Sequence, residues 1–349
     1  MVPELQQLVV TDGKANVYVY DLRLPQKPDA YQIPGITGGT DALDYNPLNH
    51  TVYIVNGNRN YITGIDLLGK SVTTRASMPG STELMRSNPN DGLIYQAITD
   101  GDKGTGGVAI YDPVLNSVTG FYPTTNCTPH GIEIDAPTNY ALLGCGTTQA
   151  QILMNLKDGS VVKTFPDVTG ADLPAYSPNT RHFYRGTGGN KSTTTGCPSN
   201  TDKTTFPIVG IISPLDGGKL IGVICSGRGT KTIGVDTIQN LMFVGGTRYP
   251  AEPGDSTTGV SGVQVFFDSA PGQPLTRTTS ATTTPVAGKG VSETMLTRPK
   301  GRNIAVDMTL QGVSGLAAIV SITTTYGNEP VECSIDYPSG AGAVPPPGQ

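Results

Sequence analysis

The sequence contains no tryptophan, only three histidines, and no pair of cysteines spaced as CxxC. Without CxxC, neither a zinc ribbon nor a thioredoxin-like redox site has its usual signature. Charged residues make up 15% of the chain, and its 23 Lys and Arg residues, against 28 Asp and Glu, form no basic block. The positive charge that neutralises nucleic-acid phosphates is therefore missing, and we expect no nucleic-acid partner.

Long apolar runs are also missing, and no segment approaches the ~18 residues that would predict a membrane span. The opening "MVPELQQLVV" has neither a basic n-region nor a cleavage site, as would be true of a mature domain given a new initiator Met. Three N-x-S/T sequons begin at Asn49, Asn126 and Asn190. Together with the low lysine content and a surface rich in Gly, Thr and Ser, they favour a secreted glycoprotein without its signal peptide, which we expect to be a monomer.

The common catalytic motifs are absent as well. The chain has no GxSxG, HExxH or Walker A sequence. The glycine-rich stretches "GDKGTGG" and "GTGGNK" lack the strand–turn–helix context that phosphate binding requires. We expect them to be loops between strands.

What the sequence does contain is a repeat. Short β-rich runs alternate with turns of Gly, Pro, Asn and Asp, and helical periodicity is scarce. Each unit opens on an ionisable residue, has a turn-forming residue about five positions later and a large apolar residue about twelve positions later. The opening residues are Asp41, Glu83, His130, Asp172, Lys231 and Glu293. Their spacings of 42, 47, 42, 59 and 62 residues are typical of propeller blades.

We therefore predict an all-β fold in which residues 1–336 form one β-propeller of four-stranded antiparallel blades. The N-terminal "LVVTDGKANVYVYDLRLPQKPDAYQIPG" resembles the last three strands of a unit, so seven blades are preferred and six are the alternative. Joining the termini would close the ring and remove an exposed sheet edge. The segment "ECSIDYP" from Glu332 is either the missing strand or the outer strand of the sixth repeat. Residues 337–349 are expected to be a flexible tail.

The recurring opening charge is predicted to face the central channel. In a propeller the innermost strands line the channel, so the six opening residues should form a ring at one mouth. Crowded carboxylates repel one another unless a cation, a proton or Lys231 offsets them. The expected metal ligands are Asp41, Glu83, Asp172 and Glu293. The expected cofactor is one divalent cation, Ca²⁺ in preference to Zn²⁺, because His50 and His182 fall at the opposite end of the hairpins from His130. The alternative is a water-filled channel whose charges bind nothing specific.

The expected register of the hairpins identifies further candidate residues. A turn near Pro89 places Gln96 opposite Glu83, and the same rule places Arg185 opposite Asp172. The expected ligand-binding residues are Gln96, Asp307, Arg59 and Arg248. The Lys, Arg and His residues at the mouth would suit a small anionic or carbonyl-bearing ligand, whereas the carboxylates would suit a metal.

The cysteines divide into two predicted pairs and one remaining residue. Cys127 and Cys145 should face each other across an antiparallel hairpin, where a disulfide is geometrically possible. Cys197 and Cys225 are the second predicted disulfide, and Cys333 is left over. Reduced, buried cysteines are the alternative for the first pair.

The stretches "CTPHGIEIDAPTNYALLGCGTTQAQILMNLKDGSVVKTF" and "NHTVYIVNGNRNYITGIDLLGKSV" resemble the YncE-like, or YVTN-type, β-propeller repeat family. The shared features are a strand ending in Asp or Asn, a short turn, an apolar strand and then "D…G…V". The resemblance implies a seven-bladed propeller without one family activity. Related propellers include lactonases, cycloisomerases and the gluconolactonase type, whose metal ligands lie at the channel mouth. Fungal secreted propellers are a looser resemblance and imply a lipid-like or other small ligand.

The leading functional hypothesis is an extracellular enzyme that acts on a small molecule at the channel mouth by lactone hydrolysis or related isomerase or lyase chemistry. A cation, or Lys231 with Arg185, would polarise a carbonyl, and His130 or a carboxylate of raised pKa would move the proton. The alternative is a non-catalytic propeller that binds a protein, glycan or lipid-like ligand through the insertions at residues 186–205 and 245–262. A fold of this kind hosts both classes of function.

Overall fold

The fold is described from a computed structural model of the 349-residue chain. The structure describes residues 2–23, 30–57, 60–101, 106–146, 150–170, 173–190, 206–227, 229–247, 261–268, 294–295, 324–326 and 329–331. Several predicted residues lie outside these ranges, and so does the predicted tail at 337–349. The predicted site residues and cysteines outside the described ranges are Arg59, Asp172, Cys197, Arg248, Glu293, Asp307 and Cys333.

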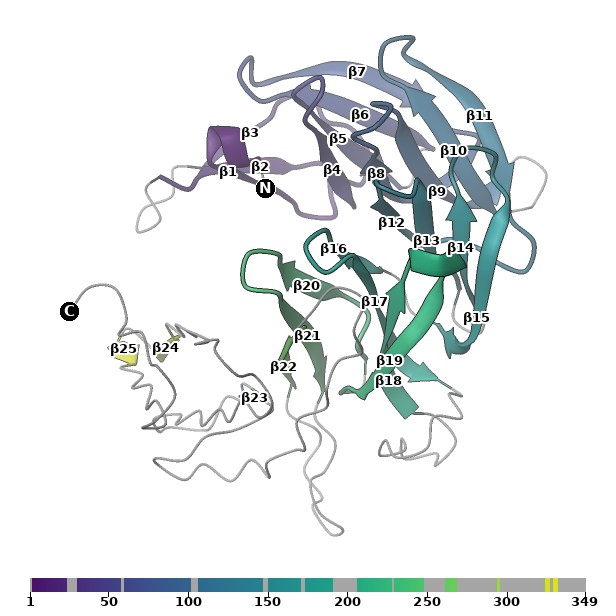
Figure 1. Cartoon of the computed structure of the whole chain (residues 1–349). Coiled ribbons are helices and arrows are strands. Elements are labelled where there is room, and N and C mark those ends of the chain that lie inside the picture. Colours follow the sequence, from purple (N-terminus) through teal and green to yellow (C-terminus); the bar gives the residue numbers. More distant parts are fainter. Residues whose placement is uncertain are drawn as a thin grey trace. The chain divides into compact units, whose positions relative to one another are not determined.

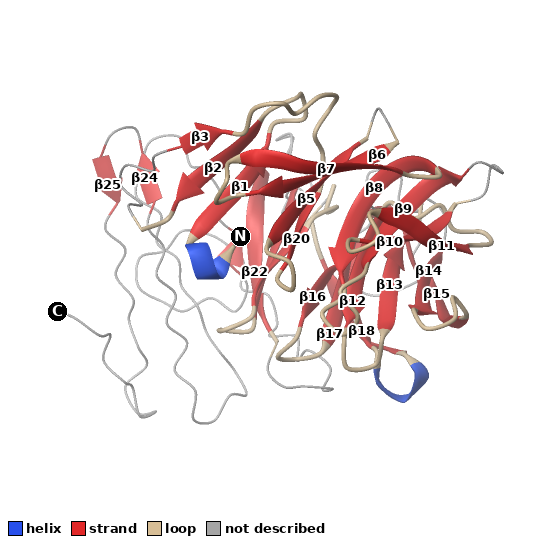
Figure 2. Cartoon of the chain, turned by 90° about the horizontal axis from the view of Figure 1, so that it is seen from above, coloured by secondary structure: helices blue, strands red, loops and turns tan. Residues whose placement is uncertain are grey.

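The described chain is almost entirely β-strand (Figure 2). Its only helical elements are two single turns of 3-10 helix, Pro3–Leu5 and Leu215–Gly217. Within the described ranges, no helix has the length and apolar character needed to cross a bilayer. The expected all-β class is thus confirmed.

Six successive antiparallel sheets are the blades of a β-propeller (Figure 1). The first blade has three strands: β1 (Gln7–Thr11), β2 (Val17–Asp21) and β3 (Ala30–Gln32). The second has β4 (Leu43–Asn46), β5 (Thr51–Asn56), β6 (Tyr61–Asp66) and β7 (Ser71–Ser77). The third has β8 (Gly80–Ser87), β9 (Ile94–Gly101), β10 (Gly107–Asp112) and β11 (Ser117–Pro123).

The later blades repeat the same order. The fourth has β12 (Gly131–Asp135), β13 (Tyr140–Gly144), β14 (Ala150–Asn155) and β15 (Val161–Thr169). The fifth has β16 (Ala175–Ser177), β17 (His182–Asn190), β18 (Phe206–Ser213) and β19 (Lys219–Cys225). The sixth has β20 (Ile233–Asp236), β21 (Leu241–Thr247), β22 (Ser261–Phe267) and β23 (Thr294–Met295). A separate two-stranded sheet contains β24 (Thr324–Tyr326) and β25 (Glu329–Val331).

The blade number is six, and the preference for seven was wrong. We expected the segment after Glu293 to begin the inner strand of a further blade. Instead, β23 pairs antiparallel with β22, with Val265 opposite Thr294, and is the outer strand of the sixth blade. First and last strands of a blade share the same short, turn-flanked β composition, so the sequence pattern did not distinguish them.

By their internal contacts the residues divide into two compact units. One unit comprises Met1–Tyr176 with Pro214–Lys219, and the other Ser177–Ser213 with Leu220–Gln349. The first four blades lie in the first unit, which holds most of the candidate site residues that the structure describes.

Blade packing in the first unit follows from strands that are apolar on both faces. In β5, Val52 and Ile54 join a buried cluster with residues of the first blade. The alternate residues Tyr53 and Val55 join a second cluster with residues of the third blade. Because successive side chains of a strand point to opposite faces, the second blade is packed between the first and the third.

The hairpin turns use one local device repeatedly. The side-chain oxygen of Asn46 accepts a hydrogen bond from Leu48 N at 3.0 Å, and that of Asp66 accepts one from Leu68 N at 2.9 Å. Asn and Asp favour turns because they form this bond to the backbone two residues later. The fifth residue of each of these turns, His50 or Lys70, has a positive φ. The turns thus fix where each pair of strands reverses.

Candidate functional site

The site begins with a bulge in β8. The ladder between β8 and β9 pairs Thr82 with Ile98 and resumes with Met85 opposite Gln96. Glu83 and Leu84 are therefore left out of the ladder. A bulge of this kind turns backbone and side-chain groups away from the regular sheet.

His130 is held next to this bulge by its backbone. It lies directly before β12, where its N–H donates to Gly144 O at 2.7 Å. Its own carbonyl accepts a hydrogen bond from Leu84 N at 3.2 Å. The bulge thus makes available the N–H group that ties the third blade to the fourth.

The side chains of Glu83 and His130 also meet. Glu83 Oε1 lies 3.4 Å from His130 Nδ1, and the two side chains are 33% and 34% exposed. Two residues of the predicted ring therefore lie next to each other, one in the third blade and one directly before the fourth. A carboxylate beside a ring nitrogen orients the imidazole and influences which nitrogen carries the proton.

Asp41 precedes the inner strand of the second blade, as His130 precedes the inner strand of the fourth. Its N–H donates to Val55 O at 3.0 Å, just before β4 begins. A Cβ placed on Gly57 would be 3.9 Å from Asp41 Oδ2 and 3.7 Å from Thr82 O. Among the residues that the structure describes, no group of three or more His, Cys, Asp or Glu side chains is arranged to hold a metal ion. Two of the four predicted ligands, Asp172 and Glu293, lie outside those residues, so the metal site stays a prediction.

Gln96 does not occupy the predicted register position. It was expected opposite Glu83 but pairs with Met85, because the bulge shifts the ladder. Its side chain is fully buried, and its Nε2 donates to Glu83 O at 2.7 Å and Ala97 O at 2.9 Å. Gln96 therefore supports the backbone of Glu83.

The two predicted cationic residues have opposite environments. The Arg185 side chain is fully buried in β17, and Lys231 is exposed just before β20. A buried guanidinium in this position does not face dissolved substrate. Both residues belong to the second unit and His130 to the first, and the partnership of either residue with His130 stays a prediction.

Sequence reasoning missed a second charged layer three residues further along the inner strands. Arg86 of β8 contacts Glu133 of β12, with Nη2 2.5 Å from Oε1, and its Nη1 lies 3.9 Å from Asp44 Oδ1 of β4. Asp44 Oδ2 also accepts a hydrogen bond from Ser87 N at 2.6 Å. The three side chains, here called the Arg86 cluster, connect three consecutive blades.

Burial and ion pairing act against each other in the Arg86 cluster. Burial raises the pKa of Asp44 and of Glu133, although the charge of Arg86 opposes the shift in both. Burial disfavours the charged form of Arg86 itself, but the charges of Glu133 and Asp44 outweigh it, and the Arg86 pKa is raised. Two partly buried carboxylates thus share one cation.

A signal for this layer was present in the repeat. Asp44 pairs with Tyr53, Arg86 with Tyr95 and Glu133 with Leu142, so position three faces position twelve in three blades. The apolar member of each pair was identified from the sequence, whereas its charged partner was not considered.

A buried polar network in the second unit was also missed. His182 Nδ1 lies 2.5 Å from Asp268 Oδ2, which also accepts a hydrogen bond from the Tyr184 hydroxyl at 2.5 Å. Burial and the Asp268 charge raise the pKa of Tyr184. His182 is fully buried, in agreement with its exclusion from the mouth.

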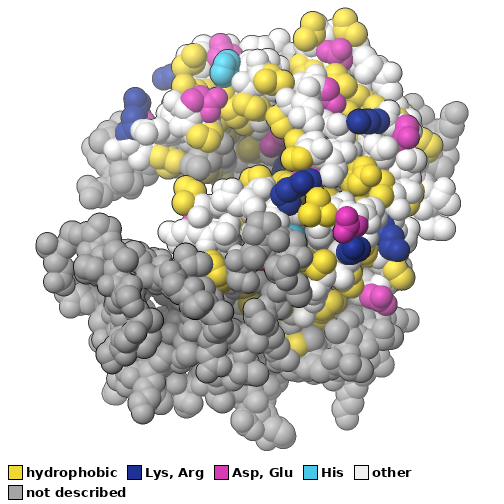
Figure 3. Space-filling model, viewed as in Figure 1, with side chains coloured by type: hydrophobic (Ala, Val, Ile, Leu, Met, Phe, Trp, Pro, Cys, Tyr) yellow, Lys and Arg dark blue, Asp and Glu magenta, His cyan; other side chains and the backbone are white. Residues whose placement is uncertain are grey.

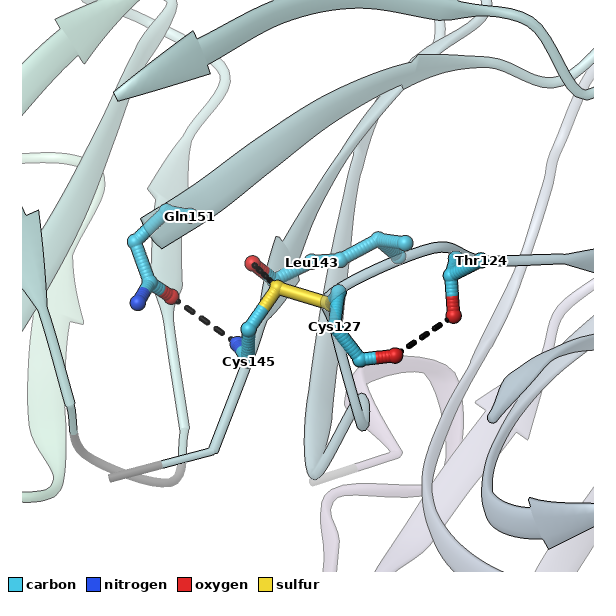
Figure 4. The surroundings of a disulfide bond; sticks show 5 residues. All are labelled: Thr124, Cys127, Leu143, Cys145 and Gln151. Atoms are coloured by element: carbon cyan, nitrogen blue, oxygen red, sulfur yellow. Dashed lines mark hydrogen bonds between the residues drawn. A yellow bond between two sulfur atoms is a disulfide. The ribbon is translucent and has the colours of Figure 1, made fainter. Parts of the chain in front are cut away.

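The Cys127–Cys145 disulfide is confirmed, with a Cα–Cα distance of 4.9 Å (Figure 4). Cys145 follows β13 and its N–H donates to Gln151 Oε1 at 3.0 Å, while Cys127 O accepts a hydrogen bond from the Thr124 hydroxyl at 2.6 Å. Cys225 is also disulfide-bonded. Its predicted partner, Cys197, lies outside the described residues, so that pairing stays a prediction.

An open pocket lies between the first blade and the β6–β7 turn of the second, apart from these residues. Its volume is about 320 Å³, and it is lined by Gln7, Asp21, Arg23, Tyr31, Leu67, Leu68 and Lys70. The Lys70 ammonium lies 4.2 Å from the centre of the Tyr31 ring. On the described part of the face in Figure 3, Lys and Arg are scattered among acidic and uncharged side chains and form no single patch.

Comparison with known proteins supports the fold alone. No family model matches the chain, and no curated protein matches it. Among solved structures, Kuenenia stuttgartiensis hydrazine synthase is similar, with a TM-score of 0.60 and 15% sequence identity over 76% of this chain and 75% of that chain. The chain is therefore a six-bladed β-propeller, and no family is assigned to it.

Proposed function

We propose that this protein is an extracellular propeller enzyme that opens a lactone ring, or carries out a related isomerase or lyase step, on a small carbonyl-bearing molecule at the channel mouth. The observation that carries the proposal is the pair of His130 and Glu83, each about one-third exposed, with 3.4 Å between Nδ1 and Oε1. An ionisable pair at a solvent-accessible end of inner strands is the kind of arrangement that active sites use.

In the proposed reaction, Glu83 keeps the proton of the imidazole on Nδ1, so that Nε2 can accept one. His130 Nε2 removes a proton from a water molecule as its oxygen bonds to the lactone carbonyl carbon. The same nitrogen then returns the proton to the ring oxygen as the carbon–oxygen bond breaks. The product is a hydroxy acid, and His130 is regenerated.

The negative charge that develops on the carbonyl oxygen needs a partner. In this proposal the Lys231 ammonium offsets that charge. As the second option, one divalent cation, Ca²⁺ in preference to Zn²⁺, would offset it and would be held by Asp41, Glu83, Asp172 and Glu293. Elemental analysis of protein purified without chelators, with melting curves in EDTA and in Ca²⁺, tests the cation. We expect about one equivalent of metal, and neither metal nor a melting shift would remove it from the proposal.

The catalytic proposal is tested with a panel of small lactones, by following acid release at constant pH. His130→Gln should lower kcat by about 10²- to 10⁴-fold, the usual contribution of a general base. Glu83→Gln should lower it about tenfold, equivalent to about 1.4 kcal/mol of transition-state stabilisation. His50→Asn is the matched control, because His50 is an exposed histidine in a turn with a positive φ that Asn tolerates.

Turnover that is unchanged by His130→Gln and Glu83→Gln would reject the proposal. A chain that binds these molecules without converting them would favour a non-catalytic binding propeller instead. Loss of partner capture on replacing residues 186–205 and 245–262 would support that second hypothesis.

We also propose that the ring is closed by joining the termini. Within the described residues β1 forms a strand ladder with β2 alone, and the β1 residues Leu8 and Val10 are 38% and 36% exposed. The segment "ECSIDYP" would supply the missing strand of the first blade. Removal of residues 332–349 should then lower the melting temperature, whereas removal of 338–349 should not.

A further inference from the structure

We infer that the loop of residues 124–130, which joins β11 to β12, is a clamp that positions His130 against Glu83. The Cys127–Cys145 disulfide is the main restraint on this loop. This inference rests on the proposed function for its purpose, but its geometry does not depend on any substrate. It makes the two cysteines positioning residues for the proton-transfer pair.

The loop itself has no regular secondary structure. A loop of this kind holds a side chain in one place only if other groups restrain its backbone. Asn126, at the apex, has a φ of +57°. Without further contacts, nothing in such a segment would keep its last residue, His130, at a fixed distance from a neighbouring blade.

Three restraints act on the loop before it reaches His130. The disulfide joins Cys127 to the end of β13, and both of its cysteines are buried. The Thr124 hydroxyl donates to Cys127 O at 2.6 Å, and Thr124 N donates to Gly106 O at 2.9 Å. The loop is therefore fastened to both β13 and the start of β10.

Close packing against Gly106 is the third restraint. A Cβ at Gly106 would lie 2.9 Å from Cys127 O, 2.9 Å from Pro129 Cδ and 3.1 Å from Thr128 Cα. Real Cβ contacts at these distances require something to move, so only glycine allows the loop to lie this close. The segment that leads directly into His130 is thus pressed against the start of β10.

Two backbone hydrogen bonds connect the restrained loop to the site. Beyond Pro129, His130 N donates to Gly144 O, the residue next to Cys145, and His130 O accepts from Leu84 N beside Glu83. The disulfide and the hydrogen bond to Gly144 fasten neighbouring parts of the loop to the same end of β13. Movement of Cys127 away from Cys145 would therefore shift His130 relative to the bulge that carries Glu83.

The experiment measures the coupling between His130 and Glu83 without substrate. The chain has only three histidines, so the imidazole ¹⁵N signals of full-length protein can be assigned by substitution. The readout is the change in the His130 ring signals that Glu83→Gln causes. We expect this change to fall at least threefold in Cys127→Ala/Cys145→Ala, and to fall partially in Thr124→Val and Gly106→Ala, which keep both cysteines.

Cys333→Ala is the control for removal of a cysteine outside the clamp, and it should leave the coupling unchanged. The signals of His182, which is buried in the second unit, report whether a variant is still folded. If the double cysteine variant does not fold, Thr124→Val and Gly106→Ala decide the question.

A full-sized response of His130 to Glu83→Gln in these variants would overturn the inference. A reduced coupling, together with a lactone panel that shows no turnover, would instead support the clamp and reject the proposed reaction. Where turnover exists, the clamp variants should lower kcat at least tenfold with KM within about twofold. A merely destabilised but folded protein would not separate the two constants in this way.

Discussion

Two charged layers occupy the same inner strands of the first unit, three residues apart, and they differ in almost every physical respect. Glu83 and His130 are about one-third exposed, lie 3.4 Å apart and belong to an irregular part of the chain. The Arg86 cluster is paired within regular ladders, and its side chains are only 13–26% exposed.

The difference shows that residues three positions apart on one strand can have different roles, one in a reactive site and the other in stabilising the fold. An exposed pair outside the ladder exchanges protons with solvent and costs little to rearrange, because exposed ion pairs contribute little to stability. A partly buried cluster costs desolvation energy, and the loss of one partner leaves charge without compensation. Glu83 and His130, here called the outer layer, are therefore suited to a functional site. The Arg86 cluster, here called the inner layer, is suited to holding the blades in register.

Removal of the shared cation should produce the largest effect on this comparison. Arg86→Met leaves Asp44 and Glu133 close together without compensation, and we expect a loss of about 2–4 kcal/mol in the free energy of unfolding at pH 7, near the low end for a broken buried pair because the cluster is partly exposed. Urea unfolding measures it. Arg75→Met, at an exposed arginine of β7, is the control and should cost well under about 1 kcal/mol. Similar losses in both variants would contradict the role of the cluster.

The same variant has a pH signature. Burial raises the pKa values of Asp44 and Glu133, so on acidification the folded chain takes up these protons before the unfolded chain does. The free energy of unfolding attributable to these groups therefore rises as the pH falls from 7 toward the raised pKa values. Arg86→Met should enlarge this rise, because its removal raises both pKa values further. Unfolding curves between pH 7 and 5 measure the slope, and a slope unchanged from that of the unsubstituted chain would refute this reading.

Loss of the support beneath the outer layer should have an intermediate effect. Gln96→Met fills a similar volume but removes the donor to the carbonyls of Glu83 and Ala97, so we expect a loss of about 1–2 kcal/mol, the cost of unsatisfied buried acceptors. The His130 ¹⁵N signals should move as well, because the bulge is no longer held. A stability loss without any change at His130 would place Gln96 in the core alone.

Neutralisation of one carboxylate in the inner layer should be nearly harmless. Asp44→Asn keeps an oxygen for Ser87 N and leaves Arg86 paired with Glu133, so we expect a change within about 1 kcal/mol at pH 7, of either sign. The pH dependence between 7 and 5 should become shallower, since one carboxyl of raised pKa is gone. A loss comparable to that of Arg86→Met would mean that Asp44 contributes more than its 3.9 Å contact implies.

Neutralisation of the outer layer should have the smallest effect on stability. Glu83→Gln and His130→Gln should each change the free energy of unfolding by no more than about 0.5 kcal/mol, as is usual for exposed pairs. Urea unfolding of both variants checks this. A loss above about 2 kcal/mol would assign the pair a structural role and weaken its candidacy as a site.

The repeat predicted the architecture because composition and spacing are local properties. Asp41 and His130 do mark the beginnings of inner strands, whereas Glu83 lies inside β8, which begins at Gly80, and the turn after Asn46 falls where Asn-Pro predicted it. The repeat pattern failed where the first and last strands of a blade have similar sequences, as with β23. It also failed where one extra residue changes the register, because the bulge at Glu83 and Leu84 leaves no trace in the hydrophobic pattern.

The charged contacts were predictable only in part. The proximity of Glu83 and His130 follows from their equivalent places in successive units. The Arg86 cluster depends on side chains long enough to reach across blades, and His182 depends on Asp268, which lies 86 residues later in the sequence. Pairings across such distances are set by the closure of the sheets and not by local spacing.

The two-sided burial of strands such as β5 has a consequence for how this chain can be divided. A cut between two blades would expose an apolar face on each piece, so neither fragment would have a water-compatible end unless a new polar surface were introduced there. Shortened or chimeric versions should therefore exchange whole blades together with the face that the next blade covers. A protease that nicks a loop without releasing a blade would, for the same reason, leave the assembly intact.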